Sequence, residues 1–166
     1  MDVHEEFLLL KHLTFMLRVE RLLLSLGFQR SKDTFVRRQP HALLTEVHWF
    51  YTRKRTNYFL TSPFFALSVA SAAGLKEVRL GDDLVMSTAE IGVLLNESGS
   101  NWISQFDSRE PSADNWFEVF ENVVQNIEAN LSPQLLDKDG ARLLLETFSR
   151  QPAYTKIAKS LITSLG

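Results

Sequence analysis

The order of helical and strand periodicities limits the fold of this chain more than any other feature. Residues 5–26 have the composition of one long Leu-rich helix, which stops at Gly27, the residue usually found just past a helix end. Strand-like runs follow, and from Ser112 the apolar spacing is helical again. Because the strands form one block, we predict an α+β fold: a long N-terminal helix, an antiparallel sheet of about five or six strands, and a C-terminal cluster of three helices packed against it.

The strand block has recognisable local signals. Residues 28–37 predict a short hairpin, and the clearest strand follows at residues 43–52, where a mainly apolar face alternates with a mixed one. Pro63 predicts a bend or bulge at which ladder pairing is lost, ahead of a Phe-rich run. A further strand is expected over residues 84–95. Trp102, Ile103 and Phe106 are expected either to form one more short strand or to cover a sheet edge.

The first helix carries more apolar residues than one buried face needs. A broad face is formed by Leu9, Leu13, Met16, Leu17, Leu23 and Leu24, and further apolar side chains widen it. Such a helix is expected to be covered on more than one side. It can therefore also carry part of a homodimer interface.

Three helices are predicted at the C-terminal end. The first, with Ser112 or Asp114 as N-cap, carries apolar residues at spacings of three and four up to Leu131. Residues 137–149 predict the second helix, and the last one follows Pro152.

Composition bounds the class of protein. A length of 166 residues suits a single domain spanning residues 1–166, and 45% apolar and 23% charged residues are typical of globular chains. The absence of cysteine excludes disulfides, thiolate metal sites and a thiol nucleophile. An acidic start and charges within the first helix argue against a signal peptide and a membrane span, so a cytoplasmic location is predicted.

The net charge of −2 hides an asymmetry between the two halves of the chain. Residues 11–55 contain ten Lys or Arg and three Asp or Glu, whereas residues 77–146 contain four and fourteen. This split predicts either a charged face for an electrostatic partner or two halves that pack together and neutralise each other.

No motif for catalysis or cofactor binding is present. The glycines are scattered, so neither a dinucleotide fingerprint nor a P-loop fits, and no Gly-x-Ser-x-Gly elbow occurs. His4 and His12 are eight residues apart and form no i, i+4 metal pair. We predict no catalytic residue, metal or cofactor, and leave open an enzyme in which His48 and Glu46, on one strand face, act as acid–base neighbours.

The candidate binding residues are basic residues at predicted strand ends and turns, together with Trp49, one of the aromatic residues nearby. They are Arg30, Arg37, Arg38, Trp49, Arg53, Lys54 and Arg55. If the hairpins place them on one edge, they form a patch suited to phosphates or to an acidic protein surface.

Several of these residues also belong to a pattern that resembles a known family. A leading helix ends in Leu26-Gly27-Phe28, followed by Arg30, by Thr34-Phe35-x-Arg37, by long β segments and by a late helix bearing Trp116. Over most of its length the chain resembles a bacterial family known as domain of unknown function 4304 (DUF4304). The resemblance implies an α+β domain of the bacterial cytoplasm without an established activity. Domains of this general kind occur among immunity proteins that neutralise bacterial toxins.

The sequence therefore predicts first a non-enzymatic protein-binding module, most concretely a toxin-neutralising immunity-type protein that covers its partner with a charged face. The enzyme alternative requires His48 and Glu46 in an open cleft with a further polar group. A nucleic-acid-binding alternative requires Arg30, Arg37 and Arg53 on one continuous face, and a sequence pI near 6.1 disfavours it.

Overall fold

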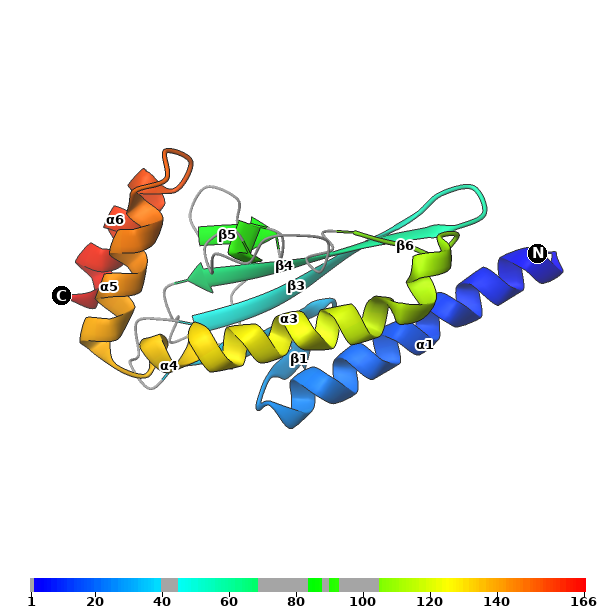
Figure 1. The fold of residues 1–166 in the computed structure, drawn as a ribbon, viewed down its shortest axis with the longest axis horizontal. Coiled ribbons are helices and arrows are strands. Elements are labelled where there is room, and N and C mark those ends of the chain that lie inside the picture. The colour runs from blue at the N-terminus through cyan, green and yellow to red at the C-terminus, as the bar shows by residue number, and fades with distance from the viewer. Residues whose placement is uncertain (1, 40–44, 69–83, 88–89, 93–104) are drawn as a thin grey trace.

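The protein is an α+β fold in a computed structural model that describes residues 2–39, 45–68, 84–87, 90–92 and 105–166 (Figure 1). A long N-terminal helix is followed by an antiparallel sheet and then by the C-terminal helices, as the sequence predicts. The element bounds are α1 Val3–Ser25, β1 Gln29–Ser31, β2 Thr34–Arg38, β3 Thr45–Lys54, β4 Phe59–Ser68, β5 Leu84–Ser87, β6 Phe106–Asp107, η1 Pro111–Asn115, α3 Trp116–Asn130, α4 Ser132–Leu135, α5 Lys138–Ser149 and α6 Thr155–Leu165.

Both ends of α1 are fixed by local chemistry. At the start, the side chain of Asp2 accepts a hydrogen bond from the backbone N–H of Glu5, and the Glu5 carboxylate accepts one from the Asp2 N–H. This capping box satisfies two N–H groups that the helix leaves unpaired. At the end, Gly27 has φ +89°, a conformation that favours glycine. The predicted stop at Gly27 is confirmed.

The described strands form a six-stranded antiparallel sheet in the order β1-β2-β3-β4-β5, with β6 also paired to β4. The predicted hairpin is β1–β2, with Lys32 in its turn at φ 54°. The predicted strand over residues 43–52 is β3, which starts at Thr45 within the described residues and continues to Lys54. Its partner β4 runs antiparallel to it over the whole length of both strands.

The prediction that ladder pairing is lost at Pro63 is wrong, because Pro63 lies inside β4 opposite Phe50. The N–H of Phe50 donates to the carbonyl of Asp33, on the β2 side, at 3.0 Å. Phe50 and Pro63 are therefore a non-hydrogen-bonded pair, in which the missing N–H of proline costs no ladder bond. On its other side β4 pairs with β6 up to Thr61 and with β5 from Phe64, so Pro63 falls between the two.

The predicted strand over residues 84–95 is shorter in the structure. β5 ends at Ser87, and residues 90–92 are helical rather than extended. Residues 93–95 lie outside the described part of the chain. Of the two alternatives for the segment ending at Phe106, the strand is found for Phe106 as the short β6, and Trp102 and Ile103 lie outside the described residues.

The C-terminal helices follow the prediction except at the start of the first. The 3-10 helix η1 occupies residues 111–115, so α3 begins at Trp116 and neither Ser112 nor Asp114 is its N-cap. The single turn α4 separates α3 from α5. Asp137 caps α5 by accepting from the N–H of Gly140 at 3.2 Å.

Two apolar clusters lie on the helix-covered face of the sheet. Near α1, the ring of Phe120 in α3 lies 5.6 Å from that of Phe50 in β3 and 6.4 Å from that of Phe15 in α1. The other cluster joins β4 and β5 to α5 and α6. Because α3 contributes to both clusters, it connects α1 to the C-terminal helices, as its course along the molecule shows (Figure 1).

Candidate functional site

The predicted basic residues do not share one face of the sheet. In the strand register, Arg30 and Arg37 fall on the helix-covered face that also carries Glu46 and His48. Arg53 is five residues after His48 in the same strand, so it falls on the opposite face, because successive residues of a strand alternate between faces. The continuous surface that nucleic-acid binding requires is therefore not formed by Arg30, Arg37 and Arg53.

Of the remaining candidates, Arg38 lines a cleft together with Arg37, whereas those of β3 and its hairpin lie elsewhere. Arg53, Lys54 and Arg55 are exposed at the tip of the β3–β4 hairpin, where the Arg55 N–H donates to the Tyr58 carbonyl at 2.8 Å. Arg38 is exposed at the end of β2. The backbone of Trp49 pairs with Thr34 and Phe64 in the middle of the sheet.

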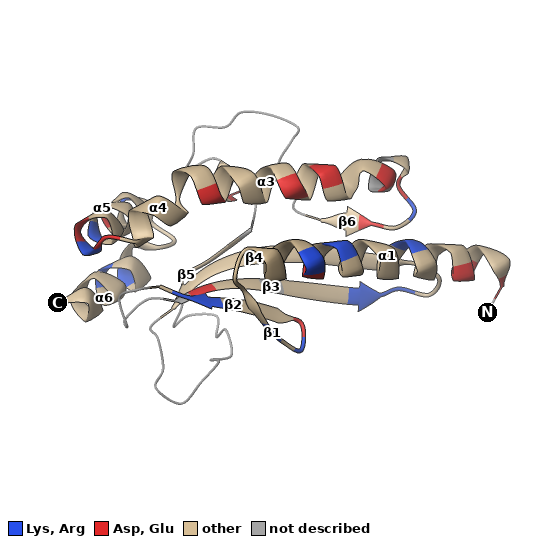
Figure 2. Ribbon diagram, turned by 90° about the horizontal axis from the view of Figure 1, so that it is seen from below, with Lys and Arg blue, Asp and Glu red and all other residues tan. Residues whose placement is uncertain are grey.

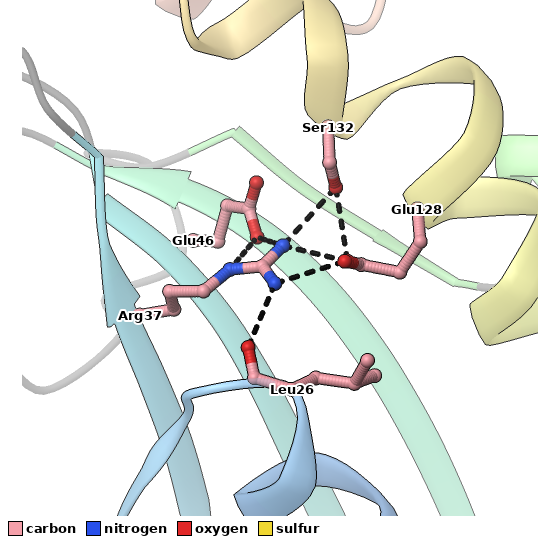
Figure 3. A network of polar contacts seen from close by, with 5 residues as sticks. All are labelled: Leu26, Arg37, Glu46, Glu128 and Ser132. Atoms are coloured by element: carbon pink, nitrogen blue, oxygen red, sulfur yellow. Dashed lines mark hydrogen bonds and ion pairs between the residues drawn. The ribbon is translucent and has the colours of Figure 1, made fainter.

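Arg37 is the centre of a polar cluster, which we call the Arg37 clamp and which consists of Arg37, Glu46, Glu128, Ser132 and the carbonyl of Leu26 (Figure 3). Its guanidinium donates to Glu46 Oε2 from both Nε, at 2.9 Å, and Nη2. Nη1 donates to the Leu26 carbonyl at 3.1 Å and to Glu128 Oε2 at 3.0 Å, and Nη2 donates to Glu128 Oε1 at 2.6 Å. Ser132 completes the cluster by accepting from Nη2 at 3.1 Å and donating to Glu128. The guanidinium has no donor direction left for a ligand.

The two carboxylates of the clamp have opposite pKa shifts. Burial raises the pKa of Glu46, which is fully enclosed, and the charge and hydrogen bonds of Arg37 only partly oppose this effect. Burial alone would also raise the pKa of Glu128, but the hydrogen bonds and charge of Arg37 outweigh it and lower the pKa of that carboxyl. The clamp thus joins the end of α1, two strands and the α3–α4 junction, which is a structural role.

His48 is enclosed and does not form a catalytic pair with Glu46. Phe28 and Phe65 meet the imidazole edge-on, with ring centroids 4.7 and 5.4 Å away. Burial, reinforced by the charge of Arg37, lowers the pKa of His48 to about 3. Because its strand pairs on both sides and only 4% of the residue is exposed, a substrate has no path to the imidazole. This observation removes the support for an enzyme built around His48 and Glu46.

A cleft of about 340 Å³ opens beside the clamp. It is lined by Arg37, Arg38, Gln39, Glu128, Ser132, Pro133 and Leu136. Arg37, Glu128 and Ser132 are bound to one another, so the cleft has few polar groups left to hold a ligand.

The outer side of α1 is an exposed apolar surface. The buried side chains of the helix are Leu8, His12, Phe15, Val19 and Leu23. On the opposite side lies an outward row of Val3, Phe7, Leu10, Leu13, Leu17 and Leu24, of which 47–83% is exposed. Exposed apolar side chains that form one patch often mark an interaction site, whereas single scattered ones are common on protein surfaces and indicate no particular function.

The spacing of apolar residues in the sequence distinguishes the outward row from the row of buried residues. Val3, Phe7, Leu10, Leu17 and Leu24 follow the alternation of four and three residues seen in helix-pairing seams, with Thr14 and Arg21 in the intervening positions. The predicted apolar face mixed the two rows, since it combined Leu23, which is buried, with Leu13, Leu17 and Leu24, which are exposed. That part of the prediction is wrong, because a helix that is apolar on most sides does not reveal which side faces the core.

A groove of about 310 Å³ runs beside the outward row, between α1 and the η1–α3 segment. Its lining combines apolar and charged residues: Phe7, Leu10, Lys11, Thr14, Phe15, Arg18, Asp114 and Phe117. Lys11 forms an ion pair with Asp114 at 2.7 Å. The guanidinium of Arg18 lies 4.2 Å from the centre of the Phe117 ring, and among the described residues no carboxylate pairs with it. The groove is thus an apolar channel with one available cation.

The charge asymmetry of the sequence is partly cancelled within the fold. The ion pairs Lys11–Asp114 and Arg37–Glu128 join the basic first half to the acidic second half. Acidic residues lie along α3, whereas α1 carries both acidic and basic residues (Figure 2). These ion pairs support the alternative in which the two halves pack together, and a charged face for an electrostatic partner stays a prediction.

Other classes of site find no match in the part of the chain that the structure describes. Among those residues, no group of three or more His, Asp or Glu side chains is arranged to hold a metal ion. No helix among them is both long enough and apolar enough to cross a membrane. The chain matches no protein-family model, no curated protein and no solved structure.

Proposed function

We propose that this protein is a non-enzymatic protein-binding module that docks a helix of its partner on the outer side of α1. The observation that carries the proposal is the outward row, which leaves six large apolar side chains in contact with solvent on one face of one helix. Burying such side chains contributes about 25 cal/mol for each Å² removed from water, so a complementary apolar surface is strongly attracted. Helix-in-groove recognition uses anchors at this spacing.

The charge at the edge of the groove indicates which kind of partner segment would bind there. The groove beside the outward row supplies apolar walls from Phe7, Leu10 and Phe117, and Arg18 supplies a cation at its edge. The matching partner segment is an amphipathic helix whose apolar stripe is flanked by a carboxylate. Such complementarity speeds association and selects the partner.

A toxin-neutralising immunity-type protein is the concrete class that we propose, on the basis of the resemblance to DUF4304 described above. A stoichiometric cover over a partner's surface needs a rigid, exposed face. The capping box stabilises the first turn of α1, the Arg37 clamp attaches its end to the sheet, and its buried side chains pack on the core, which supports a well-ordered outer side.

Affinity capture with a matched pair of variants tests the proposal. Leu10, which is 64% exposed on the outward row, and Leu143, which is 59% exposed on α5, are equivalent except for their place on the surface. Tagged wild type and L143E should recover the same protein from source-cell lysate after nuclease treatment, and L10E should lose most of it. Equal recovery by L10E, or no protein specific to wild type, contradicts the proposed docking face.

A further inference from the structure

We propose that, in the free protein, the outward row of α1 is covered by the α1 of a second copy, with the two helices antiparallel. This inference rests on the proposed docking face and names its resident occupant, so that self-association and partner binding compete. An isologous pair of this kind needs a surface that is complementary to itself.

The outward row has that self-complementarity. With a two-fold axis between Leu13 and Thr14, each residue meets the one equally far on the other side of the axis. Leu10 then lies opposite Leu17 of the second copy, and Val3 lies opposite Leu24. Leu10–Leu17 and Val3–Leu24 are therefore apolar on both sides, whereas Leu13 meets Thr14 and Phe7 meets Glu20.

The charges within the outward face fit the same arrangement. Glu6 and Arg21 both belong to exposed positions of α1, and each lies seven and a half residues, or roughly 11 Å, from the axis. An antiparallel pair brings Glu6 to the height of the partner's Arg21, and the two-fold axis makes this contact twice. A parallel pair would instead place Glu6 beside Glu6 and Arg21 beside Arg21.

Neighbouring charges do not oppose this pairing. Glu20, on the same flank as Glu6, is already paired with Arg30 at 2.8 Å. On the other flank, Lys11 is paired with Asp114 and Arg18 lies over Phe117. Antiparallel alignment also sets the two helix dipoles head to tail, which is the favourable orientation.

The outward row offers one continuous apolar contact. Its six large side chains are each about half exposed or more, and the groove beside them extends the contact. We expect a reversible dimer, because a tight one would block the partner.

Sedimentation velocity over a protein concentration series tests the inference through a charge exchange. Wild type should form dimers, and E6R and R21E, which each place like charges together twice, should weaken the dimer roughly tenfold. The double variant E6R/R21E restores both pairs and should return to within a few-fold of wild type. The control E146R changes an exposed glutamate on α5 and should leave dimerisation unchanged.

Two results overturn the inference. One is a wild type that stays monomeric at protein concentrations of tens of micromolar, and the other is a dimer whose affinity is unchanged by E6R and R21E. These failures are separate from a failure of the proposed function. If the protein is a monomer but captures a partner that L10E loses, only the proposed dimer is contradicted. If the protein forms a dimer that E6R and R21E weaken but captures no such partner, only the proposed binding function is contradicted.

Discussion

At the scale of single residues, burial has turned two chemically capable side chains into structural ones. His48 and Glu46 share a strand face, as the alternation in the sequence predicts. Their neighbours decide their role, since Phe28 and Phe65 enclose the imidazole and Arg37 holds the carboxylate. None of these neighbours is adjacent in the sequence, so the sequence could name the pair but not its surroundings.

The low pKa of His48 makes stability depend on pH. Its pKa is about 3 in the folded state and near 6.5 when unfolded, so the unfolded chain binds more protons between these values. The free energy of unfolding should therefore fall as the pH drops below about 6.5, by a few kcal/mol in total. The raised pKa of Glu46 acts in the opposite direction above its ordinary value of 4.5, and the lowered pKa of His12 acts in the same direction as that of His48.

Urea unfolding measures the His48 contribution as the slope of the unfolding free energy against pH. The useful range is pH 6.5 to 4.5, which are the ordinary pKa values of His and Glu. H48Q should flatten the dependence of unfolding free energy on pH, whatever its overall stability. The control H4Q alters an exposed histidine of α1 and should retain the wild-type slope. If H48Q shows the same slope as wild type, His48 is not the source of the pH dependence.

At the scale of elements, the Arg37 clamp fixes the end of α1 against the sheet and the α3–α4 junction. R37M removes the cation and leaves Glu46 buried without its partner, which should cost about 3–5 kcal/mol of stability. The adjacent R38M is the matched control and should stay within about 0.5 kcal/mol of wild type, because Arg38 is exposed. Equal unfolding midpoints for the two variants in urea would show that the clamp contributes nothing.

The elements also show where sequence reasoning succeeds. Several signals that act within a few residues predict the structure correctly, such as the Gly27 stop, the hairpin over residues 28–37 and the helix from residue 137, although the N-cap expected at Ser112 or Asp114 is not one of them. Pro63 was misread because its place in the ladder depends on which side Phe50 uses for its hydrogen bond. The clamp was not predicted, since Glu128 is 91 residues from Arg37 and carries no local signal.

At the scale of the whole molecule, the helix that organises one core also presents an apolar surface to solvent. Phe15 and Val19 on one side of α1 are buried, while Leu10 and Leu17 on the other side are exposed. A single chain has no need of the second row for folding. In our proposals, the outward row makes α1 a docking element, first for a second copy and then for a partner.

Disulfide cross-linking tests this account most directly, because the chain contains no cysteine and a single introduced one has no competitor. In the antiparallel pair, residue 14 lies beside its own counterpart, within the distance of roughly 7 Å that a disulfide spans, whereas the two copies of residue 24 are about 30 Å apart. Under oxidising conditions T14C should form a covalent dimer readily, and L24C, on the same exposed face, should not. Equal cross-linking of both variants, or of neither, would contradict an antiparallel contact through the outward row of α1.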